Sequence, residues 1–147
     1  MDLELHIHID EPFATLVDPN QIQGAVAAAL DGVEGAVELG VVITDDDTMK
    51  KINRSYRGLN ETTDVLSFAL GQDEAFVLPP NGVRHLGEVI ISYPEAVKGS
   101  GLARLIIHGV LHLLGYDHAQ AAEEEKMRAR EETALARIEG WRCGAQP

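Results

Sequence analysis

The sequence predicts an α+β fold: a single domain with a small mixed sheet of about four strands and helices packed mainly on one side of it. Three observations favour this class. Short apolar segments with the residue types of strands alternate with segments of helical periodicity. The chain has 147 residues, 45% of them hydrophobic, which suits one domain with its own core. The most apolar helical segment carries two histidines, as the central metal helix of a zincin does.

The expected strands follow from local patterns. Residues 2–9 alternate apolar and polar side chains, so His6 and His8 are expected on a solvent-facing side. Residues 71–84 are rich in turn formers and are expected to form a mobile loop. The other three strands are expected at residues 38–44, 65–70 and 86–92.

The first two helices have clear start signals. Asp18 is a good N-cap and Pro19 suits the first helical position, and the apolar stripe that follows stops at Gly32. Three aspartates at 45–47 favour a second helix start through capping and the helix dipole. That helix is expected to end near Gly58. Its core-facing residues are expected to be Met49, Ile52 and Tyr56.

The C-terminal half is expected to contain two long helices. Residues 97–101 form a short, glycine-containing segment that is expected to be flexible rather than helical. Residues 102–114 form the apolar histidine helix, and residues 119–138 form a charged closing helix with Glu124 and Arg128 paired four residues apart. The inward side chains of the closing helix are expected to be Met127, Leu135 and Ile138.

The charge balance argues against general nucleic-acid affinity. With 24 acidic and 12 basic residues, the net charge is −12, which repels free RNA at long range. Any cationic footprint must therefore be local. One cluster lies within eight positions, although a solvated helix face would have the same pattern. Its members are Lys50, Lys51, Arg54 and Arg57.

Cysteine usage and hydropathy predict the compartment. The single cysteine, Cys143, lies in the tail, so no internal disulfide can form and a reducing environment is expected. No apolar segment reaches membrane-spanning length, and the first residues lack the pattern of a signal peptide. We therefore expect a cytoplasmic protein.

Three histidines lie within eleven positions. His108 and His112 are four apart and share one helical face, and Gly115 suits a left-handed turn that would bring His118 back toward them. Three imidazoles with one open position are typical of catalytic zinc. The alternative is a set of hydrogen-bonded core histidines. Gly109 stands where an H-E-x-x-H peptidase carries its glutamate base, which disfavours peptide hydrolysis by that route.

These residues carry a family resemblance. The segment H-G-V-L-H-L-L-G-Y-D-H at 108–118 resembles the signature of the bacterial YbeY family, metal-dependent endoribonucleases of ribosomal RNA maturation. Similar blocks are N-x-x-Y-R at 53–57, T-D-V-L-S-F at 63–68 and L-G-E-V-I-I at 86–91, so the resemblance covers about residues 40–135. It implies one endoribonuclease domain over residues 1–147, acting on single-stranded ribosomal RNA in maturation and quality control. The implied partner is the small ribosomal subunit, with no DNA or membrane partner.

The resemblance also suggests roles for individual residues. Arg57 matches the arginine of the family block and is expected to be catalytic, since a guanidinium matches phosphate in a bidentate way. Lys51 and Arg54 are expected to bind substrate, and Asp117 to orient a ligand imidazole. No general base is identified. One divalent ion, with zinc the best match, is expected on His108, His112 and His118.

The pattern departs from the family at Ala69, where the family usually has proline. Two other functions stay open. One is a metal-dependent hydrolase of amide or peptide bonds, and the other is a non-enzymatic ribosome assembly factor with a structural metal. A structural zinc normally has a fourth protein ligand, and Cys143 is the sole thiol, which disfavours the last alternative.

Overall fold

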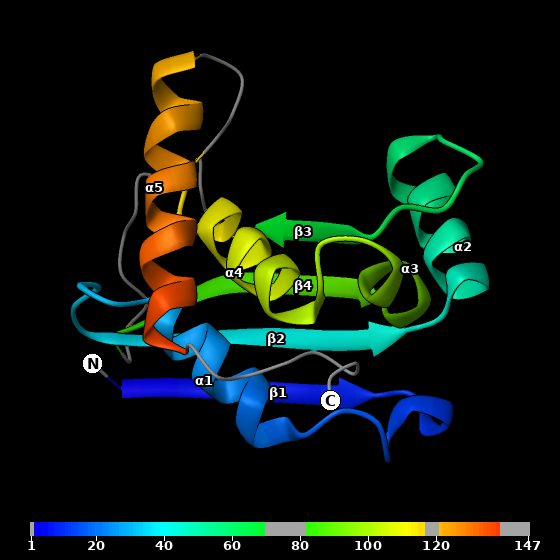
Figure 1. The fold of residues 1–147 in the computed structure, drawn as a ribbon, viewed down its shortest axis with the longest axis horizontal. Helices are drawn as coiled ribbons and strands as arrows, with labels where there is room; N and C mark the ends of the chain where they lie inside the picture. Colours follow the sequence, from blue (N-terminus) through cyan, green and yellow to red (C-terminus); the bar gives the residue numbers. More distant parts are fainter. Residues whose placement is uncertain (1, 70–81, 117–120, 139–147) are drawn as a thin grey trace.

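A four-stranded mixed sheet forms the frame of the computed structural model, which describes residues 2–69, 82–116 and 121–138 (Figure 1). Its strand order is β1-β2-β4-β3. β1 (Asp2–Ile9), β2 (Ala36–Thr44) and β4 (Val83–Ser92) are parallel, and the short β3 (Val65–Ala69) is antiparallel at the edge. The predicted α+β class and strand number are confirmed.

Two strands begin earlier than predicted. β2 begins at Ala36 and β4 at Val83, because the two strands keep pairing toward their N-terminal ends. Val83 and Arg84 were expected in a loop, and that expectation is wrong for these two residues. Gly82, from the same predicted loop, lies outside any helix or strand, and residues 70–81 lie outside the described residues.

The helices divide between the two faces of the sheet (Figure 1). One face packs against α1 (Pro19–Ala29), α3 (Tyr93–Lys98), α4 (Leu102–Leu113) and α5 (Ala121–Arg137) around the main core. α2 (Asp46–Arg57) covers part of the other face, where Met49 packs on Leu66 and Ile90. A single 3-10 turn, Glu11–Phe13, follows β1. The helices therefore lie mainly on one side, as predicted.

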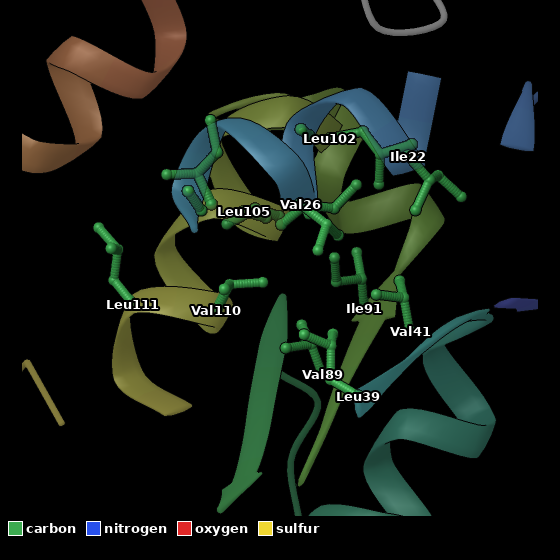
Figure 2. Close-up of a cluster of buried hydrophobic side chains, with 14 of the residues drawn as sticks. Ile22, Val26, Leu39, Val41, Val89, Ile91, Leu102, Leu105, Val110 and Leu111 are labelled. Carbon is green, nitrogen blue, oxygen red and sulfur yellow. The ribbon is translucent and has the colours of Figure 1, made fainter. Parts of the chain in front are cut away.

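The histidine helix α4 lies in the middle of the main core. Figure 2 shows its side chains meeting those of α1 from one side and those of β2 and β4 from the other. Each fully buried aliphatic side chain of this kind contributes about 1.5–3 kcal/mol through the hydrophobic effect. α4 is therefore held from several directions. The labelled side chains are Ile22, Val26, Leu39, Val41, Val89, Ile91, Leu102, Leu105, Val110 and Leu111.

Both predicted N-caps are confirmed. The Asp18 carboxylate accepts a hydrogen bond from the backbone N–H of Asn20 at 2.9 Å, at the start of α1. The Asp45 carboxylate accepts one from the backbone N–H of Thr48 at 2.7 Å, at the start of α2. This hydrogen bond is the main reason that the pKa of Asp45 is lowered.

The segment after β4 is more regular than predicted. Ser92 caps α3, with its Oγ accepting from the N–H of Glu95 at 3.4 Å, and Pro94 lies in the first turn. The expectation of a flexible segment at 97–101 is therefore wrong for its first two residues, which close this short helix. The N-cap residue, Ser92, precedes residues 97–101, so the composition of 97–101 alone did not predict this helix.

The prediction of core-facing residues on α2 is wrong for Tyr56. It was expected in the core because it continues the apolar stripe of Met49, yet it is 72% exposed. The end of α2 extends past the edge strand β3 (Figure 1), and there the Tyr56 ring meets Phe68 with centroids 5.1 Å apart. Asn53 is the buried residue of this turn, and its Nδ2 donates to the carbonyl oxygen of Glu61 at 2.8 Å.

The closing helix behaves as predicted. Met127 is buried, and the Arg128 guanidinium lies 3.9 Å from the Glu124 carboxylate. Leu135 and Ile138 pack against the main core. Across the described ranges, no helix combines the length and the apolar content that crossing a bilayer would require.

Candidate metal centre

The rotation of α4 is set by a close approach at Gly109. A Cβ atom at this position would lie 2.5 Å from Cγ1 of Val89, and the Ser67 hydroxyl donates to the Gly109 carbonyl oxygen at 3.1 Å. Only glycine fits where the helix backbone rests on β3 and β4. A glutamate at position 109 would point into the sheet, so this packing has no place for the base of an H-E-x-x-H peptidase.

His108 and His112 face each other on one side of α4. Their Nε2 atoms are 3.2 Å apart, and the rings are nearly perpendicular, with centroids 4.7 Å apart. Two nitrogen ligands of a tetrahedral zinc ion, at bond lengths of about 2.0–2.1 Å, lie about 3.3–3.4 Å apart. The observed separation fits a pair of imidazole ligands that share one ion.

A carboxylate from α5 holds His108. The Glu131 Oε2 atom lies 2.6 Å from Nδ1 of His108, and the Glu131 side chain is only 10% exposed. Its other oxygen accepts from the Arg104 guanidinium at 3.1 Å, and Arg104 also reaches the Glu132 carboxylate at 3.0 Å. Both oxygens of this buried carboxylate are therefore paired, as burial of a charge requires.

This contact determines what His108 can offer to an ion. A carboxylate accepts the proton of Nδ1, so the neutral imidazole has its lone pair on Nε2. Metal-ligating histidines in proteins usually have such a carboxylate or carbonyl on their second nitrogen. The residues present therefore fit a divalent metal ion. The third predicted ligand, His118, and the orienting Asp117 lie outside the described residues.

A cleft of about 290 Å³ opens beside His108, between α4, α5 and the start of β3. Arg104 and Arg128 supply positive charge to its lining, and Asp64 and Val65 bring the start of β3 to it. Both guanidinium groups are also paired with carboxylates, Arg104 with Glu131 and Arg128 with Glu124, so charges of both signs lie beside His108. A guanidinium in such a cleft can still bind a phosphodiester in a bidentate way. The remaining lining residues are Ser100, Leu105, Glu124, Met127 and Glu131.

Arg57, Lys51 and Arg54 are exposed on α2, and they are not in the lining of this cleft. Arg57 is the last residue of α2, and Gly58 follows in the left-handed conformation with φ 74°. The structure therefore does not bring the predicted catalytic arginine into direct contact with the histidine pair. The segment after Gly58 leads from Arg57 to Asp64 at the cleft.

A second group of side chains that could bind a metal ion lies on the exposed side of the sheet. The His6 Nε2 atom is 2.7 Å from the Glu38 carboxylate and 3.5 Å from that of Glu4. His85 also pairs with Glu38, through the other carboxylate oxygen. The hydrogen bond with His6 is the main reason that the pKa of Glu38 is lowered. His6 and His8 are solvent-facing as predicted, but this clustering was not foreseen.

Sequence reasoning missed three residues of the cleft. Arg104 had a usable signal, because it stands four residues before His108 and so shares its helical face. Arg128 was seen only as a partner of Glu124. Glu131 had no local signal, because it lies 23 residues beyond His108, within the charged closing helix.

Fold and site define a small α+β protein in which a central helix carries a histidine pair, one member held by a carboxylate, beside a cleft lined by arginines and carboxylates. The family model described as endoribonuclease YbeY matches residues 11–139. The chain belongs to the YbeY family.

Similar proteins can be aligned with most of the length of this chain. The endoribonuclease YbeY of Roseiflexus castenholzii is 40% identical, over 93% of this chain and 94% of that protein. The endoribonuclease YbeY of Moorella thermoacetica is 47% identical, over 76% of this chain and 80% of that protein. A Thermotoga maritima protein solved in solution has the same fold, with a TM-score of 0.55 and 22% identity over 91% of each chain.

Proposed function

We propose that the chain is one domain, residues 1–147, that acts as a metal-dependent endoribonuclease on single-stranded RNA. The observation that supports this most is the His108–His112 pair, with Nε2 atoms 3.2 Å apart and Glu131 on His108, at the edge of a cleft that contains Arg104 and Arg128. Membership in the YbeY family selects the phosphodiester bonds of RNA among the reactions that such a site supports.

The ion would be held by His108, His112 and His118, and zinc is the proposed metal because imidazole nitrogens suit it. When bound, a divalent ion supplies Lewis acidity, which lowers the pKa of a water molecule and polarises a phosphoryl oxygen. Glu131 accepts from Nδ1–H of His108, which leaves the lone pair of the neutral imidazole on Nε2 and fixes the orientation of the ring. Asp117 is proposed to orient another of the ligand imidazoles.

Arg57 is proposed to stabilise the negative charge that develops on the reacting phosphate. The loop between Arg57 and the cleft is held by buried Asn53, whose Nδ2 donates to the Glu61 carbonyl oxygen at 2.8 Å. Asp64, at the end of this loop, lines the cleft. A restrained loop of this kind can position a guanidinium that a substrate spanning the cleft would reach.

The cationic residues of the cleft and of α2 are proposed to bind the RNA backbone. Arg104 and Arg128 line the cleft, while Lys51 and Arg54 are exposed on α2. Because the whole chain carries a net charge of −12, this local positive charge must do the binding. A small cationic surface on an acidic protein favours binding to a particular RNA target over binding to RNA in general.

The proposed biological target is ribosomal RNA in the small ribosomal subunit, in maturation and quality control within the cytoplasm. Support comes from the family, whose members include the named endoribonucleases described above. Amide or peptide hydrolysis is disfavoured, because the Gly109 backbone packs on Val89 where the glutamate base of a zincin would stand. A purely structural metal is disfavoured by the cleft beside the ligand pair.

The test is cleavage of an unstructured RNA by the purified protein, with and without a chelator. Cleavage should require the metal and leave casein-type substrates intact. Arg57→Ala should keep its fold and metal content but lose about 10²–10³ in kcat, the usual effect of removing a charge-stabilising donor. Arg57→Lys should recover part of the loss.

Arg54→Ala is the matched control, since both arginines are exposed in the last turns of α2. It should weaken RNA binding modestly and flatten the salt dependence. Wild-type cleavage by metal-loaded Arg57→Ala would rule out the role of Arg57. Chelator-sensitive proteolysis without any RNA cleavage would overturn the proposed function.

A further inference from the structure

Tyr56 is the most exposed large hydrophobic side chain of the described residues, at 72%. The others are Leu16, Leu59 and Val97, at 56%, 40% and 45%. A tyrosine that is open to solvent adds little to the stability of the core. Its exposure leaves the ring available for contact with a ligand.

The Tyr56 ring is exposed but not loose. It meets the Phe68 ring of β3 with an interplanar angle of 61°, an edge-type contact. Such a contact uses the rim of a ring and leaves much of a flat face accessible, in keeping with the high exposure. Because Phe68 restrains it, little further side-chain entropy would be lost when a ligand stacks on Tyr56.

The helix that carries this ring also carries several cations. Arg57 is the next residue, and three further exposed cations lie on the same helix, within a chain whose net charge is −12. An exposed aromatic ring beside clustered cations is the combination that binds single-stranded nucleic acid, with stacking for the bases and cations for the phosphates. The other three cations are Lys50, Lys51 and Arg54.

The ring also lies within reach of the cleft. Phe68 and the cleft residue Val65 are on the same strand, three residues apart, which corresponds to about 10 Å. Leu66 packs with Phe68 on the α2 side of β3, while Ser67 points to α4 on the other side. A strand of RNA could therefore pass from the cleft over the edge of β3 to Tyr56.

We propose that Tyr56 is a stacking platform for an unpaired base of the RNA substrate, with the adjacent Arg57 on a neighbouring phosphate. This inference rests on the proposed function and extends it, because it assigns the preference for single-stranded RNA to the Tyr56 ring at the edge of β3. Bases in a duplex are stacked on each other and cannot occupy such a platform.

The experiment measures binding of a labelled, unstructured oligoribonucleotide by fluorescence anisotropy, with a chelator present to prevent cleavage and a gel confirming intact RNA at the end. Tyr56→Ala should weaken binding about 5- to 100-fold, the range for loss of one base–aromatic stack, and Tyr56→Phe should stay close to wild type. Binding of duplex RNA should not change. The slope of affinity against salt should stay the same in Tyr56→Ala and fall in Arg54→Ala.

Two further variants separate stacking from structure. Tyr56→Leu keeps an apolar contact with Phe68 but has no aromatic face, so it should bind as weakly as Tyr56→Ala. Leu16→Ala removes another exposed apolar side chain and should bind as wild type does. Wild-type affinity in Tyr56→Leu, in a protein that cleaves RNA normally, would overturn the platform alone. A wild-type protein that neither binds nor cleaves this RNA would overturn the proposed function as well.

Discussion

Two of the histidine–glutamate pairs among the described residues have almost the same contact distance and different surroundings. His108 lies 2.6 Å from Glu131 inside the fold, and His6 lies 2.7 Å from Glu38 on the open side of the sheet. The Glu131 side chain is 10% exposed and that of Glu38 is 25% exposed. The histidines differ more, at 28% and 59%. Only the buried carboxylate also pairs with an arginine, Arg104.

The difference shows that contact geometry alone does not make a functional site. Glu131 is held by Arg104 and by packing between α4 and α5, so it presents His108 in one orientation. Glu38 is shared by His6 and His85 in contact with water, where screening and side-chain motion weaken such pairs. We expect the first pair to govern metal binding and catalysis, and the second to contribute little to either.

The largest expected effect comes from removing a proposed ligand of the buried pair. His112→Ala should abolish both zinc binding and RNA cleavage, because two imidazoles hold an ion far less tightly than three. It should also remove the stabilisation that bound metal adds, about 4 kcal/mol when free zinc is 1,000 times its Kd. Metal analysis, thermal unfolding and a cleavage assay check this, with His8→Ala on the open side as control. Full zinc content in His112→Ala would refute the assignment.

A smaller effect is expected from the carboxylate behind His108. Glu131→Gln should lower zinc affinity about 10- to 100-fold, since it removes the charge that orients the ligand imidazole and raises its basicity. Competition with a chromogenic chelator measures this independently of cleavage. Glu132→Gln is the matched control, because it removes only the outer partner of Arg104. Equal zinc affinities in both variants would mean that Glu131 is structural.

The smallest effect is expected on the open side of the sheet. Glu38→Gln should leave RNA cleavage within about twofold of wild type, since a surface pair contributes little. The pKa of Glu38 is lowered in the folded protein, chiefly by the hydrogen bond with His6. Its contribution to stability is therefore present above the unfolded pKa of about 4.3 and disappears as the pH falls through the folded value. An NMR titration of the Glu38 carboxyl checks the direction, and a pKa at or above the ordinary value would contradict it.

Local signals predicted the helix starts and the histidine helix well. Asp18 and Asp45 cap their helices as expected, because a cap depends on neighbours within three residues. α4 runs from Leu102 to Leu113, one residue short of the prediction, since its apolar periodicity is strong. The missed parts depend on distant contacts. Strand order, the burial of Glu131 and the exposure of Tyr56 depend on how helices and strands from distant parts of the sequence pack against one another.

By itself, the sequence determined the α+β class and the positions of the main helices, and it predicted the candidate metal ligands. Each of these depends on spacing along a single element or on a local motif. Tertiary structure alone decided that Glu131 contacts Nδ1 of His108 and that the exposed Tyr56 ring contacts Phe68 of β3. It also decided that position 109 must be glycine, because its backbone packs closely against Val89. The physical reason is that these contacts join elements separated by many residues, so the packing of the sheet and helices, rather than local periodicity, brings them together.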